Sequence, residues 1–191
     1  MQRANSIIAG IVVLVLGQAL ASMGSRSATD AVRETCSASR FPDVCFEAIS
    51  SHMEMPLKNP RMMAVTAIDA AMRTTESVLA TVRLQQKSRR MSPREVAASG
   101  DCEELLDQSL YELQISLDAM KNSKQALGLM INDVQTWVSA ALTDDMTCTD
   151  GLNGKVRNDA VTPKLQAQVE HLAKLNSVAL EFINRFAASH Y

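Results

Sequence analysis

The residues that could do chemistry in this chain are a few acidic pairs, three histidines and four cysteines. Glu103-Glu104 and Asp144-Asp145 are paired carboxylates. Adjacent residues of a helix point about 100° apart, so neither pair forms a shared acid/base site. We interpret them as a solvated helix face and a helix end. The histidines are scattered at His52, His171 and His190.

The sequence contains no other signature of catalysis. It has no Gly-x-Ser-x-Gly, no phosphate-binding loop and no metal-ligand pair at helical spacing. His171, beside Leu172, is interpreted as a half-exposed bundle residue. We therefore expect a protein that is not an enzyme, with no catalytic residue, no metal site and no cofactor.

The four cysteines are Cys36, Cys45, Cys102 and Cys148. The alternative of a zinc site is disfavoured because no Cys-x-x-Cys spacing occurs. An even number behind a secretory signal is typical of disulfides. Three pairings are possible in principle, and pairing the close cysteines Cys36 and Cys45 leaves Cys102 with Cys148. If all four are paired, no thiolate nucleophile remains.

The first 24 residues predict a signal peptide. A short polar start with Arg3 precedes an apolar run from Ile7 to Ala21, and small residues follow. A transmembrane anchor is the alternative, but crossing a bilayer needs about 20 apolar residues, and no basic stop-transfer cluster follows this run. We therefore expect residues 1–24 to be removed, and 25–191 to form a secreted, extracellular domain without a membrane anchor.

Composition and charge favour helices and argue against nucleic acid. The chain has 7 glycines, 5 prolines, 4% aromatic residues and many good helix formers. The net charge of −2 gives no basic face for a phosphate backbone. The eleven methionines are interpreted as core filler.

Capping residues mark where the helices should begin. Asn59-Pro60, Ser92-Pro93 and Thr162-Pro163 each place a capping side chain before a proline suited to the first turn. A further helix is expected after Asn122-Ser123, the one turn-like point between 101 and 143.

Each of these four segments carries an apolar stripe with steps of three and four residues. The stripe of the segment after Asn122-Ser123, for example, runs from Leu127 through Ile131, Val134 and Val138 to Ala141. We therefore predict an all-α fold, an up-down-up-down four-helix bundle over 59–188. Pro42 disfavours one continuous helix over about 28–52 and favours a bent pair of short helices there, so 28–58 is expected to form a helical hairpin and linker.

Two non-core helix faces are candidates for binding a protein partner. An exposed tyrosine and isoleucine among polar neighbours are typical of such a surface, and so is a flat polar strip with few long charged side chains. Ordinary bundle surface, or packing under the hairpin, is the alternative. The candidate partner-binding residues are Glu104, Gln108, Tyr111, Glu112 and Ile115, with Asn132, Thr136, Ser139 and Thr143.

Several segments together resemble the plant invertase/pectin methylesterase inhibitor family over about 30–188. The hairpin from Cys36 to Cys45 resembles the family's opening motif, with Phe41 in the usual Tyr-Pro position. Asp101-Cys102-Glu103-Glu104-Leu105 is similar to its second-helix signature. The strongest match is Trp137-Val138-Ser139-Ala140-Ala141-Leu142-Thr143 with Thr147-Cys148-Thr149-Asp150-Gly151. Leu175-Asn176-Ser177 resembles a further segment, with Asn and Ser exchanged.

The resemblance implies the pairing of Cys36 with Cys45 and of Cys102 with Cys148. It also implies a monomeric bundle that inhibits an enzyme through a 1:1 complex covering the substrate cleft. The segment from Gln135 to Gly151 resembles the pectin methylesterase inhibitor branch, so pectin methylesterase in the apoplast or cell wall is the expected partner.

Two alternatives to this target remain open. The first is an inhibitor of acid invertase. Some invertase inhibitors use Pro-Lys-Phe, from which Pro163-Lys164-Leu165 departs at the aromatic. The second is a secreted helical signalling or ligand-binding protein that reuses the bundle.

Overall fold

Capping side chains begin two of the long helices at the predicted positions. In the computed structural model, which describes residues 28–50, 59–87, 92–153 and 161–190, α3 (Pro60–Gln86) follows Asn59. The Asn59 side chain accepts a hydrogen bond from the Met62 amide at 3.2 Å. α4 (Pro93–Asn122) follows Ser92, whose side chain pairs with Glu95 in a reciprocal capping box. The expected signal peptide over 1–24 lies outside the described residues.

The remaining two bundle helices differ from expectation at their first turns. α5 (Leu127–Asn153) begins four residues after Ser123, and Leu127 is 38% exposed because it occupies the first helical position. The prediction that Leu127 belongs to the core is therefore wrong, and Met130 is buried there instead. α6 (Val161–Ala188) begins before Thr162. The predicted start at Pro163 is thus two residues late, and Pro163 is tolerated because first-turn amides have no acceptor within the helix.

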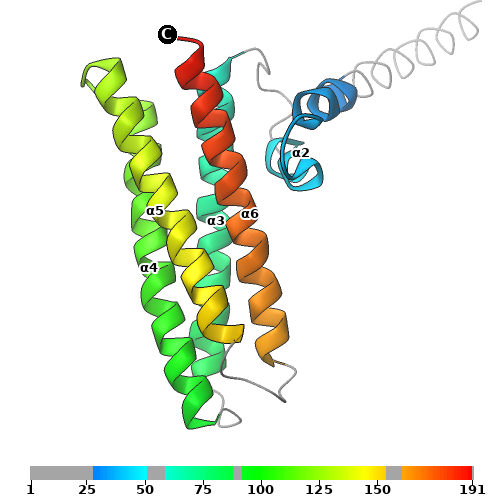
Figure 1. Ribbon diagram of the computed structural model, residues 1–191, viewed down its shortest axis with the longest axis vertical. Coiled ribbons are helices and arrows are strands. Elements are labelled where there is room, and N and C mark those ends of the chain that lie inside the picture. Colours follow the sequence, from blue (N-terminus) through cyan, green and yellow to red (C-terminus); the bar gives the residue numbers. More distant parts are fainter. Residues whose placement is uncertain (1–27, 51–58, 88–91, 154–160, 191) are drawn as a thin grey trace, which may run out of the picture.

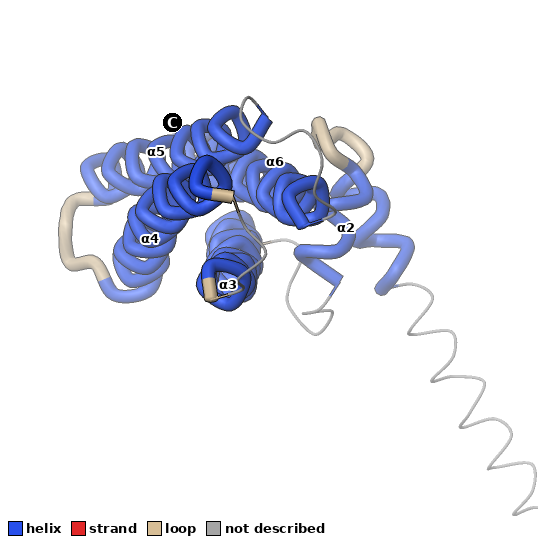
Figure 2. The backbone as a smooth tube through the Cα atoms, turned by 90° about the horizontal axis from the view of Figure 1, so that it is seen from below, coloured by secondary structure: helices blue, strands red, loops and turns tan. Residues whose placement is uncertain are grey.

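The long helices form the predicted four-helix bundle. Successive helices run in opposite directions, and each packs against two neighbours: α3 and α5 flank α4, and α3 and α5 also flank α6 (Figure 1, Figure 2). Their apolar stripes meet inside. Ile68, Leu113, Val134 and Phe182 occupy one half of the core, and Val82, Leu106, Val169 and Leu172 the other. Burial of these stripes is the main favourable contribution to the fold.

The N-terminal hairpin consists of a helix over 28–36 and α2 (Pro42–Ser50), joined by the Cys36–Cys45 disulfide. It packs against α3 and α6 and away from α4 (Figure 2). Val32 and Ile49 are fully buried in its contact with the bundle. The predicted bent pair of short helices is confirmed.

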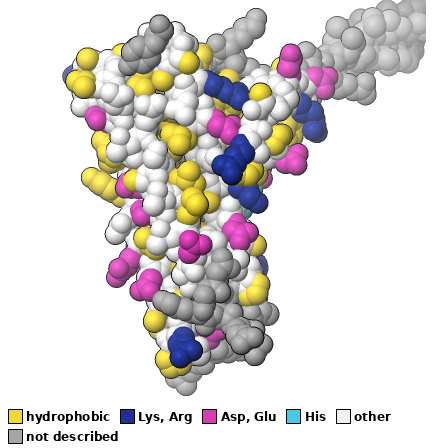
Figure 3. All heavy atoms as spheres, viewed as in Figure 1, with side chains coloured by type: hydrophobic (Ala, Val, Ile, Leu, Met, Phe, Trp, Pro, Cys, Tyr) yellow, Lys and Arg dark blue, Asp and Glu magenta, His cyan; other side chains and the backbone are white. Residues whose placement is uncertain are grey.

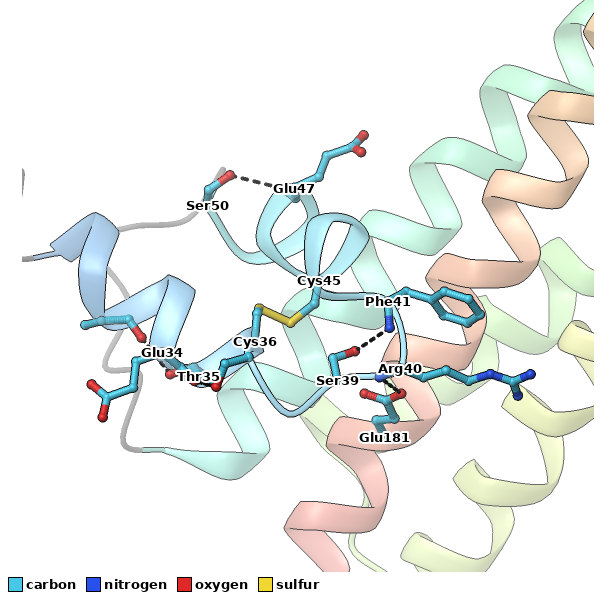
Figure 4. The surroundings of a disulfide bond; sticks show 12 residues. Glu34, Thr35, Cys36, Ser39, Arg40, Phe41, Cys45, Glu47, Ser50 and Glu181 are labelled. Atoms are coloured by element: carbon cyan, nitrogen blue, oxygen red, sulfur yellow. Dashed lines mark hydrogen bonds between the residues drawn. A yellow bond between two sulfur atoms is a disulfide. The ribbon is translucent and has the colours of Figure 1, made fainter.

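Polar contacts also tie the hairpin to α6. The Arg40 amide donates to Glu181 Oε1 at 3.0 Å (Figure 4), and Arg185 Nη1 donates to the Thr35 carbonyl at 3.1 Å. His171 Nε2 lies 3.4 Å from Glu47 Oε1. His171 is half-exposed, as expected, and it contacts the hairpin through Glu47.

The second disulfide, Cys102–Cys148, joins the early part of α4 to the late part of α5, with Cα atoms 4.6 Å apart. All four cysteines are thus paired. Across the described ranges, no helix has both the length and the apolar character needed to span a bilayer.

Candidate functional site

Most of the candidate residues lie on the solvent-facing sides of two adjacent antiparallel helices. Residues 123–126 connect α4 to α5, and the two helices pack closely along their length. Because the leucine stripe of α4 and the valine stripe of α5 point inward, the opposite sides face solvent. We call this surface the α4–α5 face. It comprises Glu104, Gln108, Tyr111, Glu112 and Ile115 on α4, with Asn132, Thr136, Ser139 and Thr143 on α5.

Exposure differs among these residues in a regular way. Tyr111 is 63% exposed, and its polar neighbours along α4 and the four α5 residues are exposed as well. Glu112 and Ile115 are half-buried, since they turn from the face toward α5. The alternative that the polar strip packs under the hairpin is wrong, because its four residues on α5 are exposed.

A groove of about 510 Å³ opens on the α4–α5 face near the loop between the helices. Tyr111 and Ile115 line it from α4, and Trp137 lines it from α5. The Trp137 side chain is half-buried and packs against the core, which holds the ring in place. The other residues that line the groove are polar or small: Gln114, Asp118, Ala119, Asn122, Ser123 and Gln125. Aromatic walls with a polar rim are typical of surfaces that bind proteins.

The hydroxyls of the α5 strip are partly occupied by their own helix. Thr136 Oγ1 donates to the Asn132 carbonyl at 2.9 Å, and Thr143 Oγ1 donates to the Ser139 carbonyl at the same distance. Each hydroxyl oxygen therefore keeps lone pairs that face solvent and can accept hydrogen bonds. Much of the surface over α5 is uncharged, with small hydrophobic groups between (Figure 3).

Two acidic side chains between α4 and α5, Glu112 and Asp144, hold protons more tightly than free carboxyls. Burial raises the pKa of Glu112 to about 7, and the nearby Asp144 carboxyl acts in the same direction. Burial also raises the pKa of Asp144. Glu112 is therefore poorly placed to carry a permanent charge toward a partner in acidic solution.

The interpretation of Asp144-Asp145 as a solvated helix end is wrong. α5 continues to Asn153, so position 145 falls on the inward stripe between Ala141 and Cys148. The Asp145 side chain is fully buried and accepts a hydrogen bond from Asn176 Nδ2 at 2.6 Å. Glu103, in contrast, lies on the surface and pairs with Arg83 at 2.7 Å.

Trp137 lines the groove on the α4–α5 face but is not among the nine residues predicted from the sequence. Its position along α5 could have indicated this role, because Trp137 lies between the buried Val134 and Val138 and the exposed Thr136. An aromatic ring at such a boundary is partly exposed and can line a surface groove.

A second groove, of about 340 Å³, lies between α5, α6 and the tip of the hairpin. Arg40 and Phe41 line it from the hairpin, Leu142 and Met146 from α5, and Lys174 from α6. None of the nine candidate residues lines this groove.

The geometry of the α4–α5 face suits binding rather than a reaction. Its side chains come from two regular helices that a disulfide ties together, so little ordering is needed when a partner binds. Within the described ranges, no group of three or more His, Cys, Asp or Glu residues is arranged to hold a metal ion. The fold and the face define a disulfide-bonded helical protein of the binding type.

The chain belongs to the plant invertase/pectin methylesterase inhibitor family, whose model matches residues 30–182. It is 33% identical over 175 residues to the 21 kDa protein of Daucus carota, covering 90% of this chain and 91% of that one. It is 29% identical over 175 residues to pectinesterase inhibitor 11 of Arabidopsis thaliana, covering 89% and 87%.

Its fold is similar to the crystal structure of a pectin methylesterase inhibitor from Arabidopsis thaliana. The TM-score is 0.58 at 18% identity, over 80% of this chain and 94% of that chain. This similarity supports the helical fold. The family and the all-helical fold predicted from the sequence are thus confirmed.

Proposed function

We propose that this protein inhibits pectin methylesterase, as a non-enzymatic protein that binds the enzyme and covers its substrate cleft. Membership of the inhibitor family supports the inhibitory role. The similarity to pectinesterase inhibitor 11 supports the choice of target. Inhibition of this kind modulates the removal of methyl esters from cell-wall pectin.

The α4–α5 face is the surface proposed to enter the cleft, as one inhibitor per enzyme. A cleft built for a polysaccharide is long and polar with aromatic walls. The α4–α5 face, which follows two long helices, is also long and largely polar and carries aromatic rings. Tyr111 and Trp137 offer rings at one end, and Thr136 and Thr143 offer acceptors along α5. Occlusion of the cleft by the α4–α5 face requires no catalytic group.

The protein is proposed to act outside the cell, as a monomer when free. Two disulfides in a domain of this size are typical of an oxidising compartment. We propose that residues 1–24 form a signal peptide and that 25–191 is the mature inhibitor domain.

A titration against two enzymes tests the function. Purified protein is added to a fixed amount of plant pectin methylesterase and, separately, of acid invertase, and residual activity is measured. We expect pectin methylesterase activity to fall to a plateau at one inhibitor per enzyme, with invertase unaffected. Inhibition of invertase alone would assign the other target, and inhibition of neither would favour a signalling or ligand-binding role.

A further inference from the structure

Asp145 and Asn176 form a buried polar pair between α5 and α6. Both side chains are 0% exposed, and Asn176 Nδ2 donates to Asp145 Oδ2 at 2.6 Å. The other oxygens of the same two side chains, Asp145 Oδ1 and Asn176 Oδ1, are buried and have no hydrogen bond of good geometry among the described residues. The buried Ser109 hydroxyl of α4 also interacts with the Asp145 carboxyl. This pair plays no part in the α4–α5 face.

The protonation state of Asp145 decides whether the pair is satisfied. An ionised carboxylate has only acceptors, and the amide has a single oxygen acceptor. An ionised Asp145 can accept from the Ser109 hydroxyl as well as from Asn176, but it leaves the buried Asn176 Oδ1 without a donor, which is costly in a protein interior. A proton on Asp145 Oδ1 supplies a donor for Asn176 Oδ1. The pair then has two hydrogen bonds, one in each direction.

The charged groups around Asp145 favour the same state. Asp144 from α5 and Glu112 from α4 both repel a negative charge at Asp145, while α6 contributes the neutral amide of Asn176. In the part of the chain that the structure describes, α3 and α6 contribute no charged group that acts on this carboxyl. Glu112 Oε2 is itself buried without a hydrogen-bond partner among these residues.

We propose that Asp145 is a neutral carboxylic acid in the folded protein, and that its acid–amide pair with Asn176 is a pH-sensitive latch between α5 and α6. The latch holds in acidic solution. As the pH rises, ionisation of Asp145 breaks one of the two hydrogen bonds and places a charge beside Glu112 and Asp144, which loosens the bundle from inside.

The direction follows from proton linkage. Burial raises the pKa of Asp145 to about 8, with Asp144 and Glu112 adding to the rise and hydrogen bonds from Asn176 and Ser109 opposing it. An unfolded Asp has a pKa of about 3.9. The folded protein thus binds more protons than the unfolded chain between these two values. Stability is therefore greatest below about pH 4 to 5 on account of this group and falls as the pH rises toward 8.

Thermal melting of the intact, disulfide-bonded protein at pH 5 and pH 8 tests the latch. We expect the melting temperature of the parent to fall by roughly 5–10 °C between these pH values. In Asp145→Asn, an amide replaces the neutral acid and can form both hydrogen bonds with Asn176. We expect this variant to melt near the parent at pH 5, to exceed it at pH 8, and to lose at least half of the pH-dependent fall.

Asp150→Asn is the matched control, because Asp150 is an exposed carboxyl on the same helix. It should follow the parent at both pH values. If Asp145→Asn instead shows the same pH-dependent fall as the parent, the latch is refuted.

Proton release provides a measurement that does not require the variant to fold. Unfolding of the parent by guanidinium at pH 6, in weakly buffered solution with a pH indicator, should release about two protons per molecule, one from Asp145 and most of another from Glu112, whose pKa is about 7. Release of about one proton or fewer would show that Asp145 is ionised in the folded protein and would overturn the proposal.

Discussion

The backbone amide of Arg40, at the tip of the hairpin, donates a hydrogen bond to Oε1 of Glu181 in the C-terminal half of α6 at 3.0 Å. These residues are 141 positions apart in the chain. The contact fixes the loop that the Cys36–Cys45 disulfide encloses, and Figure 4 shows Glu181 beneath this loop. The position of the hairpin thus depends on one carboxylate of the bundle as well as on apolar packing.

Replacement of Glu181 by Ala should loosen the hairpin without unfolding the bundle. The Arg40 amide loses its acceptor, at a cost of about 1 kcal/mol, while the cores between the long helices keep their contacts. We expect faster hydrogen exchange in residues 28–50, measured by mass spectrometry, with exchange in α4 and α5 unchanged. Glu170→Ala, on the same helix, is the control. Equal protection of the hairpin in Glu181→Ala and the parent would show that packing alone holds it.

Replacement of Tyr111 by Ala should weaken inhibition of pectin methylesterase. An exposed aromatic ring beside a groove is typical of residues that dominate binding energy, so we expect the inhibition constant to rise roughly tenfold or more. Melting should change little, because the ring is largely in solvent. Inhibition equal to that of the parent would exclude this part of α4 from the contact surface.

Substitution of Thr136 by Arg tests the α5 side of the same face. The long charged side chain would project from the flat strip and prevent close approach of a cleft wall, so inhibition should weaken while melting stays nearly unchanged. Lys174→Ala is the control. Lys174 lies on α6 in the second groove and should affect neither property. Weaker inhibition by Lys174→Ala, with Thr136→Arg still active, would move the contact surface to α6 and the hairpin.

The Cys102–Cys148 disulfide should contribute more to stability than Cys36–Cys45. In the chain-entropy model, a closed loop of 46 residues constrains the unfolded chain by roughly 4 kcal/mol and one of 9 residues by nearer 3 kcal/mol. We expect the double Cys→Ala variant of the longer loop to melt at the lower temperature. A larger loss from the Cys36 and Cys45 variant would show that the hairpin braces the bundle more strongly than its loop length indicates.

The sequence predicts the helices well because their signals are local. Asn59 and Ser92 cap the helices that they precede. The apolar stripes also specify which side of each helix points inward, so the outward position of Tyr111 and Thr136 follows from counting residues along one helix. The four-helix arrangement required only that these stripes be buried together.

The features that the sequence did not predict depend on contacts between helices. Burial of Asp145 follows from its place on the inward stripe, four residues after Ala141, only because α5 continues past it, and its partner Asn176 comes from α6. A carboxylate pair read along the chain resembles a solvated surface, since most such pairs are exposed. Trp137 becomes part of a groove only because α4 places Tyr111 and Ile115 beside it. The loop length after Asn122 was similarly unspecified by periodicity.

The disulfide between Cys102 and Cys148 has a further consequence for the two helices that carry the α4–α5 face. Residues 123–126 connect these helices at one end, and sulfur connects them toward the other. Together they form a closed covalent ring. A protease that nicked the connecting turn would therefore leave both halves of the face attached to each other. Separation of the fragments would require a reductant as well as a cut.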